Sequence, residues 1–180
     1  MSGLINSAGS KSGVIGFKTP VALAYGSATG DQSPVKNSSQ NYTMQLNTED
    51  DPYNIISISS NVVTVSYGGM YCIEFNSGNL LTYNEGGSYD VTWCHFSLHK
   101  NGSHLISGNE MYLADTVAGS SDKPTTNTDG SHIYRITSGD AFHLELDTAR
   151  EDNEPLGWQG GAATGGVSTY ARILFTRIGE

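Results

Sequence analysis

The chain has 180 residues, of which 37% are hydrophobic and only 15% are charged. This length suits one domain that buries roughly 70% of its unfolded surface, which is enough for a core without disulfides or metals. The formal net charge of −9 argues against nucleic acid as a main partner and against docking on an anionic membrane, since both need a basic field. No stretch approaches the ~20 apolar residues of a membrane span, so we expect no membrane insertion.

Residues 1–16 are small, polar and rich in glycine, and they cannot bury a face of their own. They form either an anchoring peptide that becomes ordered on a partner or a frayed terminus. The apolar residues available for docking are Leu4, Ile5, Val14 and Ile15. The segment has no apolar run long enough for a signal peptide, so we expect synthesis in a cytoplasm.

Apolar and polar residues alternate through much of the first half of the chain. This alternation, with many β-branched and aromatic residues, predicts strands over residues 17–25 and 41–46. In the first of these, Val21, Leu23 and Tyr25 share one face. Residues 53–58 form either a short strand or a turn.

Residues 61–75 are predicted to form two strands around a tight corner. Val63, Val65 and Tyr67 alternate with polar residues before the corner. Gly68-Gly69 supplies the positive φ that a sharp turn needs. The second strand follows directly.

The second half contains further strands separated by turn signals. Asn101-Gly102 after a strong strand at 91–99 is a hairpin signal, and Ser138-Gly139-Asp140 marks another turn. Residues 148–166 form the longest irregular piece. Residues 80–83, 104–107, 111–117, 132–136 and 141–146 are the remaining strand candidates. We expect about nine or ten strands and no helix, which is typical of a β-sandwich or jelly roll.

The terminal strand at 167–178 is apolar on both faces. Tyr170, Leu174 and Ile178 lie on one face, and Ala171, Ile173 and Phe175 lie on the other. A strand that is apolar on both faces is buried on both. In an antiparallel sandwich this implies a covering layer or a subunit interface.

Four motifs occur in an order that resembles the complement C1q-like and tumour-necrosis-factor-like (TNF-like) jelly rolls. Residues 69–75 (GMYCIEF) are similar to the family's G-x-Y-x-F-x-F strand, and residues 96–102 (FSLHKNG) to its strand ending in L-x-K-N-G. Residues 136–144 (ITSGDAFHL) resemble its L-x-x-G-D-x-V-x-L segment, and residues 168–175 (STYARILF) its closing S-T-F-S-G-F-L-L strand. Arg172 stands where the family usually has glycine. The resemblance covers roughly residues 17–178.

This resemblance implies an all-β, two-sheet antiparallel jelly roll of about ten strands over residues 17–180. It also implies a homotrimer that binds other molecules and does no chemistry. On this basis Tyr71, Tyr170 and Leu174 belong to the core or to the trimer interface. The segment 1–16 separately resembles the leaders of virion proteins from tailed bacteriophages, especially marine ones, which implies a peptide that docks the domain on a particle.

Candidate sites for metals and thiol chemistry are few. His95 and His99 share strand parity, so they are either a ligand pair or separately packed side chains. Cys72 and Cys94 each lie in a predicted strand, and they are either free buried thiols or the two halves of a disulfide. An acidic loop is either solvated or a calcium site; its members are Asp147, Glu151, Asp152 and Glu154. We expect no cofactor, with calcium as the alternative.

Trp158 lies in a glycine-rich stretch, where it either stacks on a ligand such as a sugar or plugs the end of the sandwich. The first functional hypothesis is a phage virion structural protein, a trimeric fibre or spike tip that contacts other virion proteins and a host receptor or glycan. The second is a capsid decoration or cement protein with the same trimer. The third is a carbohydrate-active enzyme on a jelly roll.

Overall fold

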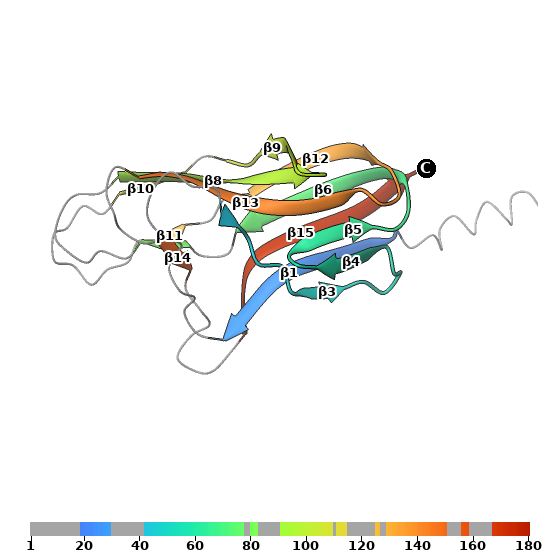
Figure 1. Ribbon diagram of the computed structural model, residues 1–180, viewed down its shortest axis with the longest axis horizontal. Coiled ribbons are helices and arrows are strands. Elements are labelled where there is room, and N and C mark those ends of the chain that lie inside the picture. Colours follow the sequence, from blue (N-terminus) through green and yellow to red (C-terminus); the bar gives the residue numbers. More distant parts are fainter. Residues whose placement is uncertain are drawn as a thin grey trace, which may run out of the picture.

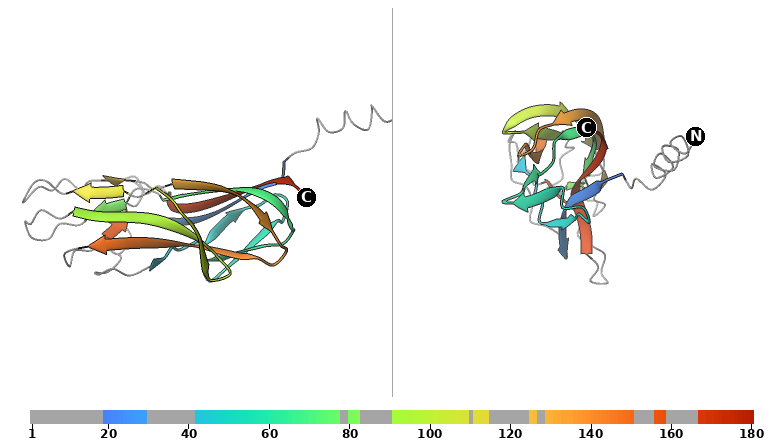
Figure 2. Two further views of the ribbon diagram at one scale, coloured as in Figure 1. Left: turned by 90° about the horizontal axis from the view of Figure 1, so that it is seen from above. Right: turned by 90° about the vertical axis from the view of Figure 1, so that its right-hand side faces the viewer.

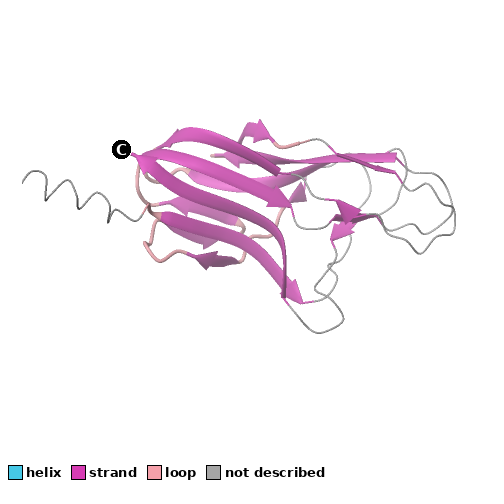
Figure 3. Cartoon of the chain, turned by 180° about the vertical axis from the view of Figure 1, so that it is seen from behind, coloured by secondary structure: helices cyan, strands magenta, loops and turns pink. Residues whose placement is uncertain are grey.

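The computed structural model describes residues 19–29, 42–77, 80–82, 91–109, 111–114, 125–126, 129–150, 156–158 and 167–180. These residues form fifteen strands and no helix, which confirms the all-β prediction (Figure 3). Within them there is accordingly no helix long and apolar enough to cross a membrane. Two large antiparallel sheets pack against each other as a jelly-roll sandwich, each with a path of five strands (Figures 1 and 2).

The first sheet has five strands in the order β12-β6-β15-β1-β3, all paired antiparallel. Their bounds are Asp129–Ile136 for β12, Gly69–Ser77 for β6, Val167–Gly179 for β15, Val21–Thr29 for β1 and Thr48–Asp50 for β3. The terminal strand β15 lies at the centre of this sheet. Its inward residues Ala171, Ile173 and Phe175 are buried as predicted, but the other face is not, because Arg172 is exposed and Ile178 is 52% exposed.

The second sheet follows the path β10-β8-β13-β5-β4, with β2 beside β13 and β9 beside β8. Its strands are Met111–Ala114 (β10), Val91–Lys100 (β8), Ala141–Arg150 (β13), Val62–Val65 (β5), Ile56–Ser59 (β4), Tyr42–Thr43 (β2) and Ser103–Ser107 (β9). A small sheet lies at the end of the molecule away from the C-terminus (Figure 1). It contains Thr125–Thr126 (β11), Leu80–Thr82 (β7) and Leu156–Trp158 (β14).

The predicted corner between the strands of residues 61–75 passes the chain from one sheet to the other, because β5 and β6 belong to different sheets. Only Gly69 has a positive φ there, of 149°. A side chain on Gly69 would meet the carbonyl oxygen of Gly179 at 2.6 Å, so close approach to β15 requires glycine as much as the turn does. Tyr67 does not continue the buried face of Val63 and Val65, because the chain has already left the strand and 51% of Tyr67 is exposed.

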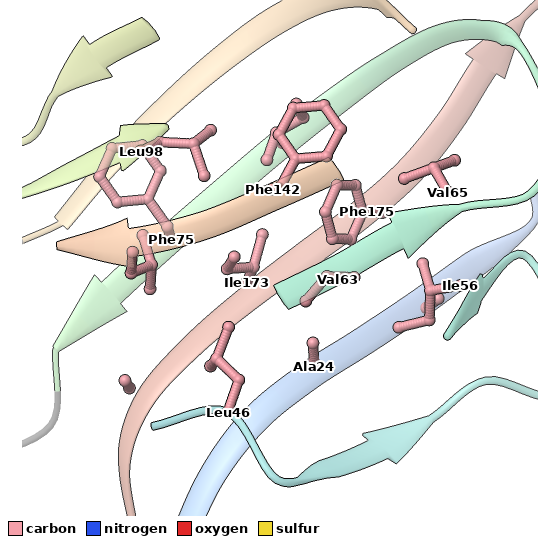
Figure 4. Packing of buried hydrophobic residues seen from close by; sticks show 14 of the residues in the cluster. Ala24, Leu46, Ile56, Val63, Val65, Phe75, Leu98, Phe142, Ile173 and Phe175 are labelled. Carbon is pink, nitrogen blue, oxygen red and sulfur yellow. The ribbon is translucent and has the colours of Figure 1, made fainter. Parts of the chain in front are cut away.

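The core lies between the two sheets, where the inward faces interlock (Figure 4). Phe142 from β13 and Phe175 from β15 meet edge to face with ring centroids 5.4 Å apart, and both side chains are fully buried. Edge-to-face pairing is favoured by the aromatic quadrupole, so this contact joins the sheets directionally as well as by burial.

Two hairpin turns contain adjacent residues with positive φ. Asn101 and Gly102 have φ values of 50° and 76°, as the tight hairpin between β8 and β9 requires, which confirms the Asn-Gly prediction. A second hairpin, between β4 and β5, has Ser60 and Asn61 at φ values of 51° and 68°. Asn61, which is predicted to begin a strand, therefore lies in the turn that precedes β5. Within the stretch predicted to be irregular, residues 148–150 belong to β13 and residues 156–158 form β14.

Candidate functional site

The outward side of the five-stranded sheet carries side chains in rows that cross four strands. The inward residues of these strands are in the core, and consecutive strand residues point to opposite faces, so their neighbours point outward. The strand register aligns twelve of these outward residues in three rows, which we call the outer rows. In the order β1, β15, β6, β12 they are Val21, Thr176, Cys72 and Ile133; Leu23, Leu174, Glu74 and Ser131; and Tyr25, Arg172, Asn76 and Asp129.

Strand β1 places its larger side chains in the outer rows. The residues that point into the core are Ala22 and Ala24, which are 1% and 0% exposed. They lie opposite Phe175 and Ile173 of β15, so small side chains of one strand accommodate large ones of its neighbour. The apolar face formed by residues 21, 23 and 25 is therefore on the outside of the sandwich, where it is only partly buried.

The outer rows are apolar at one side and polar at the other. On β1 and β15, Leu23 lies directly opposite Leu174, and both are half-buried. On β6 and β12 the same row continues into Glu74 and Ser131, which are exposed. Ile133 at the β12 edge is 58% exposed, so a second apolar contact lies beyond the polar region.

A hollow of about 440 Å³ lies over the middle of these rows. Its lining includes Leu23 and Leu174 together with three charged side chains, Glu74, Asp129 and Arg172. Arg172, the departure from the family pattern, therefore brings a guanidinium from β15 to the same hollow as the carboxylates of Glu74 and Asp129, which lie on the neighbouring strands β6 and β12. The hollow can receive a side chain that offers both an apolar stem and a polar tip.

A second polar cluster ties together the turns that precede β9 and β13. Asp140 accepts hydrogen bonds from the Asn101 side-chain amide at 2.9 Å and from the Thr137 backbone N–H at 2.8 Å. Its carboxylate also lies 2.9 Å from Lys100 Nζ. Asn101 in turn accepts from the backbone N–H of Ala141 at 2.9 Å. This network joins two of the sequence motifs, and its donors are all used in holding turns, which indicates a structural role.

Electrostatics agree with that role. Burial by itself raises the pKa of the Asp140 carboxyl, but the hydrogen bond from Thr137 and the bonds from Lys100 and Asn101 outweigh it and hold the pKa below its ordinary value. The same contact raises the pKa of Lys100, chiefly through its hydrogen bond to Asp140. The Lys100 ammonium also lies 4.9 Å from the centre of the Tyr134 ring, a cation–π distance.

The histidines do not group as their strand parity suggested. His95 and His99 both lie in β8, but His99 meets a histidine of the neighbouring strand. The ring centroids of His99 and His143 are 4.9 Å apart, and those of His99 and His104 are 5.5 Å apart. Cross-strand pairing therefore decides which histidines meet, and the sequence does not specify the partner strand.

The predicted interface-or-core residues lie in different places. Tyr71 is fully buried in the core cluster, where burial raises the pKa of its hydroxyl against the opposing effect of Arg177. Its O–H donates to the backbone carbonyl of Tyr67 at 2.9 Å. Leu174 lies in the outer rows. Tyr170 is in β15, and its side chain is outside the described residues.

Several other predicted sites fall wholly or partly outside the described residues. These include the docking candidates Leu4, Ile5, Val14 and Ile15, the acids Glu151, Asp152 and Glu154, and the side chains of Asp147, Cys94 and Trp158. The backbone of Trp158 is in β14, paired with Leu80 of β7, rather than in a loop. Cys72 is a free thiol in the outer rows.

Comparison with known proteins identifies the fold as that of the TNF-like jelly roll. A solved TNF-family structure, Eiger from S. frugiperda, superposes with a TM-score of 0.53 at 8% identity, covering 91% of this chain and 95% of that one. Murine APRIL is 12% identical, with a TM-score of 0.48, and the match covers 89% of this chain and all of that one. No protein-family model and no curated sequence matches the chain.

Proposed function

We propose that this chain is a non-enzymatic structural module that self-associates as a homotrimer through the outer rows. The observation that carries the proposal is the orientation of β1, which turns Val21, Leu23 and Tyr25 outward while alanines fill the core side. In an isolated sandwich, the fold would be more stable if β1 buried its larger apolar side chains in the core. The outward orientation of the larger side chains is explained if a second copy of the chain covers the outer face of β1.

The division of the outer rows suits a cyclic trimer better than a two-fold dimer. In a ring, each contact joins two different patches of neighbouring subunits. The apolar side formed by Leu23 and Leu174 would then face the β6–β12 side of the next copy, which carries Glu74, Ser131 and Ile133. The family resemblance of the motifs supports the same number of subunits.

A charge placed in the outer rows tests this proposal. Leu174→Glu puts a carboxylate beside Leu23 and Glu74, where covering it costs desolvation and adds repulsion. We expect sedimentation velocity to show a trimer for the unmodified chain and a monomer for the variant, with circular dichroism unchanged. Ser57→Glu, on an exposed position of β4, is the control and should stay trimeric. A Leu174→Glu protein that remains a trimer would contradict the assignment of the surface.

The particle that this trimer serves is proposed from the leader. Its resemblance supports a phage virion protein in which residues 1–16 dock the trimer as a fibre or spike tip, with the far end free to meet a host receptor or glycan. We expect a phage whose copy of this chain lacks residues 1–16 to assemble particles without it. Immunogold labelling of particles with the intact chain distinguishes the tail from the capsid, and labelling on the capsid would favour a decoration protein instead.

A further inference from the structure

Two histidines and a glutamate converge on the outward face of the other large sheet. His99 of β8 lies directly opposite His143 of β13, and Glu145 follows two residues later on the same face of β13. The Nε2 atom of His143 is 3.0 Å from Glu145 Oε1, and that of His99 is 3.4 Å from Oε2. One candidate ligand atom from each residue lies within 4.8 Å of both others.

From this geometry we infer a binding site for a divalent transition-metal ion of the zinc class, with His99, His143 and Glu145 as ligands. Two imidazoles and one carboxylate are a ligand set that zinc uses with water in its remaining position. Tetrahedral bonds of about 2.0–2.1 Å place ligand atoms roughly 3.3 Å apart. The two contacts of Glu145, at 3.0 and 3.4 Å, are close to this spacing, and all three candidate ligand atoms lie within 4.8 Å of one another.

The core fixes where these ligands point. Leu98, Phe142 and Leu144, which alternate with the ligands along β8 and β13, are fully buried. A slip of one residue in either strand would drive these side chains into solvent, so the outward placement of His99 and His143 is locked. Ligands held on rigid strands lose little freedom when an ion binds.

The burial of the three side chains suits an exchangeable ion. Their exposed fractions are 11% for His99, 14% for His143 and 18% for Glu145. They are shielded enough to strengthen interactions with a cation, yet an ion and its water can reach them from solvent. Nitrogen ligands favour zinc over calcium or magnesium, which prefer oxygen.

The site is independent of the proposed trimer. It lies on the seven-stranded sheet, and the outer rows lie on the five-stranded sheet. An ion at this position would cross-link β8 to β13, the central pair of its sheet, and would therefore stabilise the fold whatever the number of subunits.

Calorimetric titration of the full-length, untagged chain with Zn²⁺ tests the inference. We expect one Zn²⁺ per chain and a rise in the thermal unfolding midpoint, with no comparable heat from Ca²⁺ or Mg²⁺. His143→Ala and the shape-conserving Glu145→Gln should each weaken Zn²⁺ binding by about tenfold or more, since even indirect disturbance of metal ligands costs 10–100-fold. Glu145→Gln keeps the test valid if His143→Ala folds poorly.

His132→Ala is the matched control, because His132 is a half-buried histidine of the other sheet, stacked near Tyr134. It should leave the affinity for Zn²⁺ unchanged. Saturable binding that His132→Ala weakens as much as Glu145→Gln does would move the ion away from this cluster and overturn the inference. Failure of the unmodified chain to bind Zn²⁺ saturably would overturn it as well, leaving a hydrogen-bonded trio without an ion.

Discussion

The two outer faces of the sandwich cover the same core and differ in what they display. The five-stranded sheet presents Leu23 and Leu174 side by side, half-buried and apolar. The seven-stranded sheet presents His99, His143 and Glu145, which are polar and mutually bonded. Because the inward faces are alike in being aliphatic and aromatic, they explain the fold but not this difference. Both proposals therefore depend on the outward positions, with a second copy proposed to cover one sheet and an ion proposed to bind the other.

The largest expected effect comes from removing the contact that both faces share. Phe142→Ala leaves a cavity against Phe175 between the sheets, which should lower the free energy of unfolding by about 3–5 kcal/mol. Urea unfolding measures this loss, and Phe142→Leu should lose less. Tyr67→Ala, at a half-exposed aromatic outside the core, should change stability by no more than about 0.5 kcal/mol. If Phe142→Ala lowered the free energy of unfolding only slightly, the contact between Phe142 and Phe175 would not be a main support of the packing between the sheets.

The Asp140 network should matter next, and only at pH values where the carboxylate is charged. Asp140→Asn removes the ion pair with Lys100 and should cost about 2 kcal/mol near neutral pH. Since the folded-state pKa lies below the ordinary value of 3.8, this stability is complete above that value and is lost as the pH falls through the folded pKa.

Unfolding free energies measured from pH 7 to pH 2 check this, because the gap between the native chain and Asp140→Asn should narrow on acidification. Asp50→Asn, at an exposed position of β3, serves as the control and should show no such gap. A gap for Asp140→Asn that stays constant down to pH 2 would contradict the account of its charge.

A smaller effect distinguishes the β6–β12 side of the five-stranded sheet. A methyl group on Gly130 would lie 2.4 Å from Phe75 Cζ, and Phe75 is 2% exposed and cannot swing away freely. We expect Gly130→Ala to destabilise the chain by about 1–2 kcal/mol in urea unfolding. Gly179→Ala, whose methyl group would meet Met70 at an ordinary 3.7 Å, should be nearly neutral. Equal effects of the two variants would contradict this packing.

The smallest expected effect is a change in the rate at which Cys72 is chemically modified, which tests whether the outer rows are covered. Cys72 is a half-buried free thiol in the outer rows, between Thr176 and Ile133. If a second copy covers this face, iodoacetamide should modify Cys72 more slowly in the assembled chain than in monomeric Leu174→Glu. Peptide mass spectrometry follows Cys72 separately from Cys94. Equal rates would mean that the face is open in both.

The sequence predicts the parts of this fold that depend on local chemistry. The Asn101-Gly102 turn and the buried face of β15 could be recognised because each depends on a few adjacent residues. Which face of β1 points into the core could not be predicted, because the residues on both faces are apolar. Packing against Phe175 and Ile173 of β15 selects the face that carries the alanines. The sequence shows only that the two faces differ in side-chain size, and the face with the larger side chains is not always the buried one.

The histidine cluster shows the same limit more sharply. His143 and Glu145 form an H-x-E pair that any strand places on one face. Their partner, His99, comes from a strand more than forty positions away along the chain, and the pairing of β8 with β13 brings it into register. Strand parity alone suggested His95 and His99, since periodicity contains no information about which strands are neighbours.

The most direct test of the central claim is the solution mass of the unmodified chain, measured by light scattering with and without residues 1–16. We predict a mass three times that of the 19.2-kDa chain, unchanged by the deletion apart from the missing residues. A trimer in both forms would locate self-association in the jelly roll and leave the leader available for docking. A monomer in both forms would contradict the claim that the outward apolar face of β1 and β15 is built to be covered by a second copy.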